Sequence, residues 1–405
     1  MERERLIRTA IDQVFEQYCK NNASLKLETL AVEKEKLFQY FYQRNQQSKT
    51  SLIEELVKKE IAYLKYWLEF YKISGMSASI ALNFGPELYF YLGTCGDTEL
   101  PIDEQVSWDI ASISKLFTNI HALLDWKFNY IQINKPINQI NPNFHYGCTI
   151  LELLNFYYEL RTHPRIDVGN CDSKEALKLL QFASTEAIGV HTYSDIPHMI
   201  YSRLAPNFKE HFTLYFNTLM GLSNTGYEIN SNQLKTGNDY RYPDEIRDKK
   251  ARICDYSGHA GIWSNSKDLV RFFHFLSRKT ILTSEDLALL TTLLTNDNYP
   301  RAMLYRQTGL GLYQNSEVPR ISSDTAFAAS GSTGCWLIMD LKNGYTINIL
   351  TNPYSSKNGI PARYTAKLND LKYSLMEVTR KLQIIVKINQ LEEQKEFLQK
   401  EYVLK

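Results

Sequence analysis

Ser112 and Lys115 stand three residues apart, where a polar segment gives way to an apolar helical pattern. The apolar face that follows consists of Leu116, Ile120, Leu123 and Leu124. Three-residue spacing places Ser112 and Lys115 on one face of such a helix, close enough to interact. A lysine amine in an apolar, cationic site loses its proton readily. It would then deprotonate the serine hydroxyl and activate it for acyl transfer, with the helix N-terminus favouring the developing negative charge.

The same pair also fits an ordinary helix start, in which Ser112 caps the helix and Lys115 is solvated. Spacing alone favours this second interpretation. The chain holds another Ser-x-x-Lys match, from Ser264 to Lys267. There Ser266 precedes an apolar helical pattern and is expected to be its N-cap, so a helix start explains that match fully.

Residues 1 to about 72 contain neither proline nor glycine and are rich in Glu, Lys, Leu and Tyr. This composition predicts three helices, with breaks near residues 19–24 and 44–51. Beyond Gly75, the β-like runs 76–82 and 88–93 form a hairpin candidate.

A second hairpin is predicted where residues 335–341 and 345–352 flank an Asn-Gly pair at 343–344. Because neither hairpin would be stable alone, the two must meet in one sheet. Between them the sequence is mostly helical. The predicted helices are Ile150–Leu160, Lys174–Ala183, Lys209–Met220, Lys267–Lys279 and Leu287–Leu294, the last after a Thr283-x-x-Asp286 capping box.

The tail from about Ala362 has one long helical pattern. Its apolar residues alternate by three and four and are Leu368, Leu371, Leu375, Val378, Leu382 and Ile385. Such a stripe is compatible with a coiled-coil seam, but packing on the protein's own sheet is favoured.

The segment WDIASISKLFTN resembles the nucleophile segment of the serine β-lactamase and penicillin-binding-protein superfamily, closest to its class C-like esterase and peptidase branch. Three further segments resemble that branch in the same order: HTYSDIPHMIYSRL, DEIRDKKARICDYSGHAGIWSNSKDLVRFF and ASGSTGCWLIMDLKNGYTINILTNPY. The resemblance spans about Ser74 to Tyr354.

The resemblance implies an α+β fold of the β-lactamase/transpeptidase type. Such a fold has an antiparallel sheet flanked by N- and C-terminal helices, plus an all-helical subdomain. We expect a helical N-terminal extension over 1–50 and a hydrolase domain over 51–362, with its helical insertion at about 112–280. Residues 363–405 are expected to form a C-terminal helix that packs on the sheet or contacts a partner.

By resemblance, Ser112 is the nucleophile, Lys115 its proton acceptor and Tyr193 a second general base or acid that passes a proton to the leaving group. Without the motif, Tyr193 would be one more tyrosine packed at a loop. Asp195 stands where an amide is more common, and is expected to hold Lys115 or a substrate amide, to cap the next helix, or both. The backbone N–H groups of Ser112 and Ser332 would form the oxyanion hole.

The third motif departs from the family pattern. Lys-Thr-Gly or His-x-Gly is usual, whereas this chain has Ala329, Ser330 and Gly331. Ala329 can neither bind a substrate carboxylate nor tune Tyr193, so β-lactam hydrolysis and carboxypeptidase action are expected to be weak. Ser330 and Ser332 still offer hydroxyls to a substrate.

A second departure is the usual His-Thr-Ser-Gly-Leu loop, which is replaced by LLNFYYELRTHPRID over residues 153–167. That loop shapes the edge of the pocket in the family. His259 is expected to be a structural loop residue rather than a member of a catalytic triad.

The net charge is +1, from 46 basic and 45 acidic residues, which gives no electrostatic footprint for nucleic acid or an anionic membrane. The N-terminus has no signal-peptide pattern, and six scattered cysteines without a C-x-x-C indicate free thiols, so a cytoplasmic protein is expected. The sequence contains no H-E-x-x-H, G-x-S-x-G, G-x-G-x-x-G or Walker motif, and no cofactor or metal is predicted.

We therefore expect an intracellular serine hydrolase or acyltransferase that acts on an ester or amide of a small peptide or metabolite through an acyl-enzyme on Ser112. Esterase, peptidase and transacylase remain open. The alternative is a catalytically silent relative that serves as a binding or scaffold protein. Residues 1–50 and 362–402 are candidates for contact with a partner or a second copy.

Overall fold

The computed structural model describes residues 2–20, 27–189, 193–228, 235–236, 245–290, 323, 326–352 and 369–403. Its first three elements are the helices α1 (Glu2–Lys20), α2 (Leu27–Tyr42) and α3 (Lys49–Phe70), which confirm the three predicted helices. The side chain of Ser48 caps α3 by accepting a hydrogen bond from the Ser51 N–H at 3.2 Å.

Five antiparallel strands form the main sheet, in the order β2-β1-β10-β9-β8. Their bounds are β1 (Gly75–Leu82), β2 (Glu87–Gly93), β8 (Phe327–Ser330), β9 (Trp336–Asp340) and β10 (Tyr345–Thr351). Both predicted hairpins are present, and β1 pairs with β10, so the prediction that they share one sheet is confirmed. Gly344 has φ of +69° in the second turn, which explains why an Asn-Gly pair stands there.

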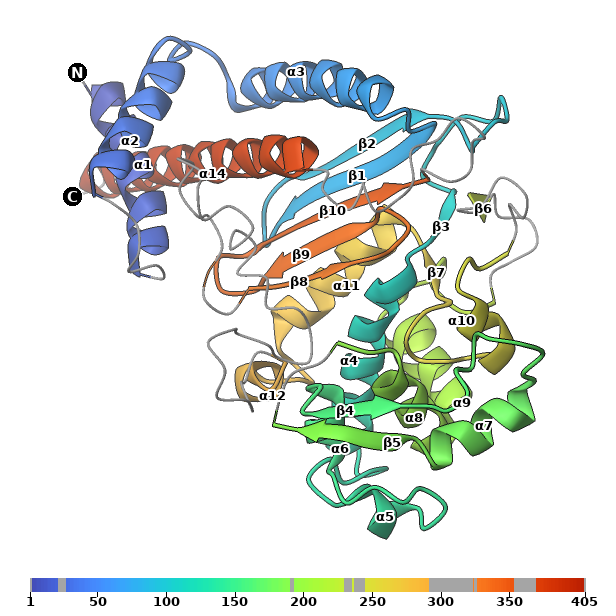
Figure 1. Cartoon of the computed structure of the whole chain (residues 1–405). Coiled ribbons are helices and arrows are strands. Elements are labelled where there is room, and N and C mark those ends of the chain that lie inside the picture. Colours follow the sequence, from blue (N-terminus) through green and yellow to red (C-terminus); the bar gives the residue numbers. More distant parts are fainter. Residues whose placement is uncertain are drawn as a thin grey trace.

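The sheet separates two hydrophobic cores because successive side chains along a strand point to opposite faces. On β9, Ile338 belongs to one core, whereas Leu337 and Met339 belong to the other. The first core is closed by α1, α2, α3 and the long α14 (Asn369–Val403), and the second by α4 (Ser114–Lys127) and α11 (Ser266–Arg278). Figure 1 shows α3 and α14 over one face of the sheet and α11 against the other, with both chain termini at the same end of α14.

The apolar stripe of α14 faces this first core. Leu371, Leu375 and Leu382 have no exposed surface, and the helix contacts β1, β10, α1 and α3. The stripe therefore packs on the protein's own sheet and helices, as the favoured interpretation expected. Residues 362–368, which include Leu368 of the predicted stripe, lie outside the described residues.

The region between the two hairpins is mainly helical. Its remaining elements are β3 (Ser107–Asp109), the 3₁₀ turn η1 (Ala111–Ile113), α5 (Ile137–Ile140), α6 (Ile150–Leu154), β4 (Tyr158–Arg161), α7 (Ser173–Gln181), β5 (Ser184–Ile188), α8 (Ile196–Leu204), α9 (Phe208–Phe212), the π-helix η2 (Thr213–Leu219), β6 (Lys235–Thr236), α10 (Lys249–Cys254), β7 (Trp263–Ser264) and α12 (Ser284–Ala288). Two small sheets, β4-β5 and β6-β3-β7, lie among these helices, so the subdomain is not all-helical.

The predicted helix Ile150–Leu160 is wrong in its second half. The helix ends at Leu154, where the Asn155 side chain donates to the Leu151 carbonyl and Phe156 adopts φ of +57°. A left-handed residue cannot continue an α-helix, so the chain turns and enters β4.

The prediction for Ser266 is also wrong by one residue. Asn265 is the N-cap of α11, and its side chain accepts from the Asp268 N–H at 2.9 Å. Ser266 instead lies under the sheet, 2.7 Å from both the Ser77 hydroxyl and the Asn348 amide oxygen. The Thr283 capping box of α12 is confirmed, whereas residues 291–294 lie outside the described part of the chain.

Among the residues that the structure describes, no helix combines the length and the apolar character needed to cross a membrane.

Candidate active site

Ser112 lies in the short 3₁₀ turn between β3 and α4, and it is half-buried. The buried carboxylate of Asp109 holds this turn by accepting from the Ala111 N–H at 2.9 Å. Ala111 has φ of +46°, a strained value for a residue with a Cβ. No side chain caps α4 within the described residues, so the interpretation of Ser112 as a helix cap is wrong.

The hydroxyl of Ser112 is placed between an amine and a phenol. Lys115 Nζ lies 3.1 Å from Ser112 Oγ, and the Tyr193 hydroxyl lies 3.0 Å from the same oxygen. The Lys115 ammonium is also 4.8 Å from the centre of the Tyr193 ring. Lys115 is 3% exposed, which excludes the solvated alternative, whereas Tyr193 is 38% exposed and borders open space. The structure thus brings together three residues that the motifs had singled out.

Lys115 has two further partners, the Asp195 carboxylate at 2.8 Å and the His259 carbonyl at 3.2 Å. Burial by itself lowers the pKa of Lys115, but the charge and hydrogen bonds of Asp195 and Tyr193 together outweigh burial and leave the pKa above its ordinary value. The expectation of an amine that readily loses its proton is therefore wrong for this state of the site. Lys115 is an ammonium group because its closest charged partner is an anion.

Asp195 precedes α8, but among the described residues its side chain makes no capping hydrogen bond. Oδ1 faces Lys115, and Oδ2 lies 2.5 Å from Lys250 Nζ. Burial raises the pKa of Asp195, yet the charges of Lys115, His259 and Lys250 together hold it well below its usual range. The carboxylate is thus an anion shared between two ammonium groups.

Lys250 was not singled out by the sequence motifs. It lies in α10, directly after Lys249, so the pair looks like an ordinary solvated face of a short helix. The one available signal was Asp195 itself, because an extra carboxylate in a half-buried site requires a cation.

His259 is held away from a catalytic role. Its Nε2 lies 3.0 Å from Asp248 Oδ1, while its carbonyl accepts from Lys115. The other function of Asp248 is to cap α10 by accepting from the Ala251 N–H at 2.9 Å. Burial raises the pKa of Asp248, but the hydrogen bond and charge of His259 lower it to about 2.

Two clusters of described residues have donor atoms within 4.8 Å of one another, as a metal site would require. The first is Asp195, Asp248 and His259, where two ammonium groups already occupy Asp195 and disfavour a cation. The residues in this cluster therefore do not fit a metal ion.

The second cluster is the fully buried Asp125 with His121 and His211 in the helical region. Its carboxylate oxygens lie 2.8 Å from both His211 Nδ1 and the Tyr215 hydroxyl, and 3.1 Å from the Tyr201 hydroxyl. His121 Nδ1 lies 3.3 Å away. Asp125 is therefore a buried carboxylate whose hydrogen-bonding capacity is used by its neighbours.

The third motif lies against the nucleophile turn. A Cβ added at Gly331 would lie 2.6 Å from the Ile110 carbonyl oxygen, so only glycine allows β8 to approach this closely. The neighbouring Ser332 is exposed, and its carbonyl accepts from the Arg247 guanidinium at 3.1 Å. The Arg247 N–H in turn donates to Asp109 Oδ2 at 3.0 Å. One carboxylate thus ties the nucleophile turn to the segment that holds Ser332.

Asp109 is fully buried, and burial raises its pKa to about 6. Ala329 is 5% exposed and contributes a methyl group to the core. Ser330 is half-buried at the end of β8. The proposed roles of Ser330 and Ser332 toward a substrate stay predictions.

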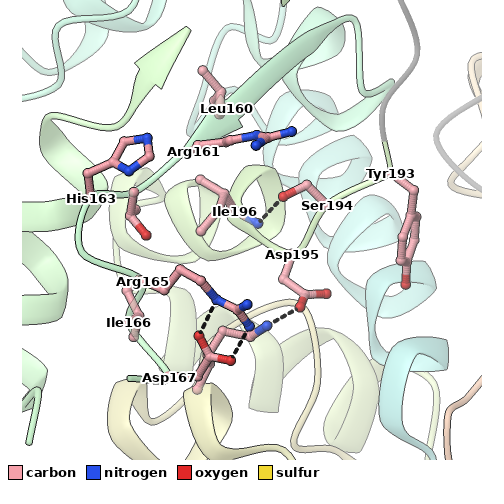
Figure 2. A pocket seen from close by; sticks show the side chains of 12 residues that line it. Leu160, Arg161, His163, Arg165, Ile166, Asp167, Tyr193, Ser194, Asp195 and Ile196 are labelled. Atoms are coloured by element: carbon pink, nitrogen blue, oxygen red, sulfur yellow. Dashed lines mark hydrogen bonds and ion pairs between the residues drawn. The ribbon is translucent and has the colours of Figure 1, made fainter. Parts of the chain in front are cut away.

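A pocket of about 490 Å³ adjoins Tyr193 and Asp195. It is lined by Leu160, Arg161, Thr162, His163, Arg165, Ile166, Asp167, Tyr193, Ser194, Asp195, Ile196 and Lys250. Figure 2 shows Arg165 and Asp167 paired with each other across the pocket from Tyr193, with Asp195 between them. One wall therefore comes from residues 160–167, the segment that replaces the family's usual loop.

Comparison with known proteins agrees with this geometry. The family model described as Beta-lactamase matches residues 52–369. A search of curated proteins found no match.

Solved structures resemble the chain over most of its length. A class C β-lactamase from Rhodobacter sphaeroides is 16% identical, with a TM-score of 0.59 and coverage of 78% of this chain and 98% of the other. A β-lactamase/D-alanine carboxypeptidase from Pseudomonas syringae is 17% identical, with a TM-score of 0.60 and coverage of 80% and 99%. A β-lactamase from Sulfitobacter sp. EE-36 is 15% identical, with a TM-score of 0.58 and coverage of 82% and 97%. The predicted α+β fold of the β-lactamase/transpeptidase type is confirmed.

Proposed function

Because the chain belongs to the Beta-lactamase family, we propose that it is a serine hydrolase or acyltransferase that acts on an ester or amide through an acyl-enzyme on Ser112. The observation that carries this proposal is the position of Ser112 Oγ, 3.1 Å from the Lys115 amine and 3.0 Å from the Tyr193 hydroxyl. A serine used only for packing has no need of two proton-transfer groups on one oxygen.

In acylation, Ser112 Oγ bonds to the substrate's carbonyl carbon and loses its proton. Lys115 cannot accept that proton while it is the ammonium that Asp195 stabilises. We therefore assign the transfer to the Tyr193 oxygen, which lies 3.0 Å from Ser112 Oγ and beside the Lys115 ammonium. Tyr193 then gives the proton to the leaving group as the carbonyl–leaving-group bond breaks.

The oxyanion that forms in between would accept hydrogen bonds from the N–H groups of Ser112 and Ser332. Water, or a second nucleophile in acyl transfer, then gives its proton to Tyr193 and attacks the acyl carbon. Ser112 recovers its proton from Tyr193 as the acyl–serine bond breaks. Each residue is thereby returned to its starting state.

A fluorophosphonate probe tests the nucleophile directly. We expect one probe adduct on the wild-type chain by intact mass, located to Ser112, and none on Ser112→Ala. Ser264→Ala is the matched control because it removes the serine of the other Ser-x-x-Lys, whose hydroxyl lies 2.8 Å from Thr225 within the core. An adduct that persists on Ser112→Ala while circular dichroism shows an unchanged fold would refute the proposal.

Ala329 favours a second candidate, a catalytically silent binding protein, because it removes a polar side chain that the family uses in the third motif. That protein would take no label from any serine-directed probe. The same position leads us to expect weaker labelling by a penicillin than by the fluorophosphonate, since Ala329 cannot bind the penicillin carboxylate.

We also propose an intracellular location. The five cysteines whose side chains are described, Cys95, Cys148, Cys171, Cys254 and Cys335, are all free, and four of them are buried. Unpaired buried thiols are typical of a reducing compartment. The substrate would then be a small peptide or metabolite rather than cell-wall material.

A further inference from the structure

Lys250 and Lys115 contact opposite oxygens of one carboxylate. Lys115 Nζ lies 2.8 Å from Asp195 Oδ1, and Lys250 Nζ lies 2.5 Å from Oδ2. Lys115 is buried, and the Lys250 side chain is 20% exposed at the pocket wall. The two ammonium groups come from different elements, α4 and α10, and meet only through Asp195.

We propose that Lys250 is a positioning residue that balances the charge of Asp195 and thereby sets the pH range in which Ser112 is acylated. This inference rests on the proposed function of Ser112. It concerns a residue whose contact with the site is the Asp195 carboxylate, through which it acts.

Asp195 and Lys250 carry opposite charges, so together they leave the net charge beside Lys115 unchanged. An ammonium beside a neutral amide has a net charge of +1. Replacing that amide by Asp195 alone would reduce the net charge to zero, and Lys250 restores it to +1. The chain thus carries an acid and a base where the family more often has an amide.

A positive charge beside Asp195 repels a further proton, so it disfavours protonation of the group that accepts the proton of Ser112. Loss of Lys250 must therefore raise the pH at which the acceptor becomes available. Loss of the Asp195 charge must lower it.

Other groups facing Lys115 stay constant in this comparison. They are the Tyr193 hydroxyl, the His259 carbonyl and the buried His198, whose pKa burial and the Lys115 charge both lower. The His259 imidazole, 3.0 Å from Asp248 Oδ1, also faces Asp195 and is unaltered in every variant compared. Burial lowers the pKa of Lys250, but the charges of Asp195, Asp248 and Asp167 outweigh burial and raise the pKa above its ordinary value.

The test is the pH dependence of the rate at which the fluorophosphonate labels Ser112. The acidic limb is the pH region in which the labelling rate rises with pH. Lys250→Met should move it to higher pH by roughly 1–3 units, the usual effect of one nearby unit charge. Asp195→Asn should move it in the opposite direction. The double variant Asp195→Asn/Lys250→Met restores the net charge of +1, so its limb should return to within about half a unit of wild type.

Lys249→Met is the matched control, because this neighbouring lysine extends away from the site and donates to the Gly169 carbonyl at 3.1 Å. It should leave the limb in place. A merely structural role for Lys250 would lower the labelling rate at every pH, with no displacement of the limb and no recovery in the double variant. That result overturns the inference while Ser112 labelling still supports the proposed function. A wild-type chain that takes no label overturns both.

Discussion

Gly331→Ala tests whether close contact between β8 and the nucleophile turn is needed for acylation. The new Cβ would lie 2.6 Å from the Ile110 carbonyl oxygen and 3.2 Å from the Ala111 Cβ. Ordinary van der Waals contact begins at 3.4 Å, so β8 and the turn must separate by about 0.8 Å. These two atoms belong to the nucleophile turn and its first flanking residue, whereas the third close atom, Thr333 Oγ1 at 3.1 Å, belongs to a side chain. The backbone oxygen of Ile110 makes the shortest contact and has no side-chain freedom with which to move aside.

The separation has a cost in stability and a larger one in rate. Overpacking of this kind typically lowers the free energy of unfolding by about 1–3 kcal/mol. A shift near 1 Å in a reacting geometry costs roughly 100-fold in rate, similar to the loss of one oxyanion-hole donor. We therefore expect the rate of Ser112 labelling to fall about 100-fold, while the melting temperature falls by only a few degrees.

Gly147→Ala is the matched control, since a Cβ at Gly147 would meet nothing within 4 Å. It should keep the wild-type labelling rate. The assay is stopped-time intact-mass labelling at pH 7 and 25 °C, with thermal unfolding measured on the same samples. A Gly331→Ala variant that labels within threefold of wild type would refute the reasoning, because it would show that the position of Ser332 does not matter to the reaction.

Two further variants test the supports of the site. Arg247→Ala removes the guanidinium that donates to the Ser332 carbonyl at 3.1 Å, and it should slow labelling by roughly 3- to 10-fold with little change in unfolding, measured by the same mass assay. Asp125→Asn should lower the free energy of unfolding at pH 7 by about 3 kcal/mol in urea titrations, because it breaks a buried network that holds four donors. Burial raises the pKa of Asp125, but hydrogen bonds and the charge of His121 outweigh it and lower the pKa. The stabilisation is therefore present above the ordinary carboxyl range and lost as the pH falls through the lowered pKa, so the deficit of Asp125→Asn should shrink as the pH falls below the ordinary carboxyl range.

Local signals account for the parts of the fold that the sequence predicted well. The three N-terminal helices follow from a long stretch without proline or glycine, and the β9–β10 hairpin follows from the left-handed requirement met by Gly344. The error over Ile150–Leu160 has a local cause that composition hides. Phenylalanine seldom adopts a positive φ, so the residue type gave no warning of the turn at Phe156. The Phe156 ring packs between two other rings, with its centre 5.3 Å from those of Tyr193 and His198.

The protonation of Lys115 was beyond sequence patterns for a different reason. Apolar surroundings were correctly expected, and burial does lower the pKa of Lys115. The groups that reverse the effect are Asp195, 80 residues away along the chain, and Tyr193. Whether that carboxylate faces Lys115, caps α8 or binds substrate depends on how α8 packs on α4, and motif spacing carries no information on this.

The role of Lys250 also depends on a tertiary contact that the sequence does not reveal. Lys249 and Lys250 are identical in type and adjacent in sequence, yet one donates to a distant backbone carbonyl and the other to Asp195. The turn geometry of a six-residue helix decides between them. The sequence contains one indication of a basic partner, which is the aspartate at position 195 where the family more often has an amide.

The departures from the family pattern differ in what they affect. Ser112 Oγ keeps contacts near 3 Å with both Lys115 and Tyr193, and Gly331 keeps the close approach of β8. By contrast, residues 160–167 form one wall of the pocket, and Ala329 is a buried alanine where the family more often has a polar side chain. The pairing of Asp195 with Lys250 follows from the burial of a carboxylate, whether or not the chain is an enzyme. The contacts kept around Ser112 Oγ are therefore the observation that supports the proposed nucleophile, and the labelling of Ser112 tests it.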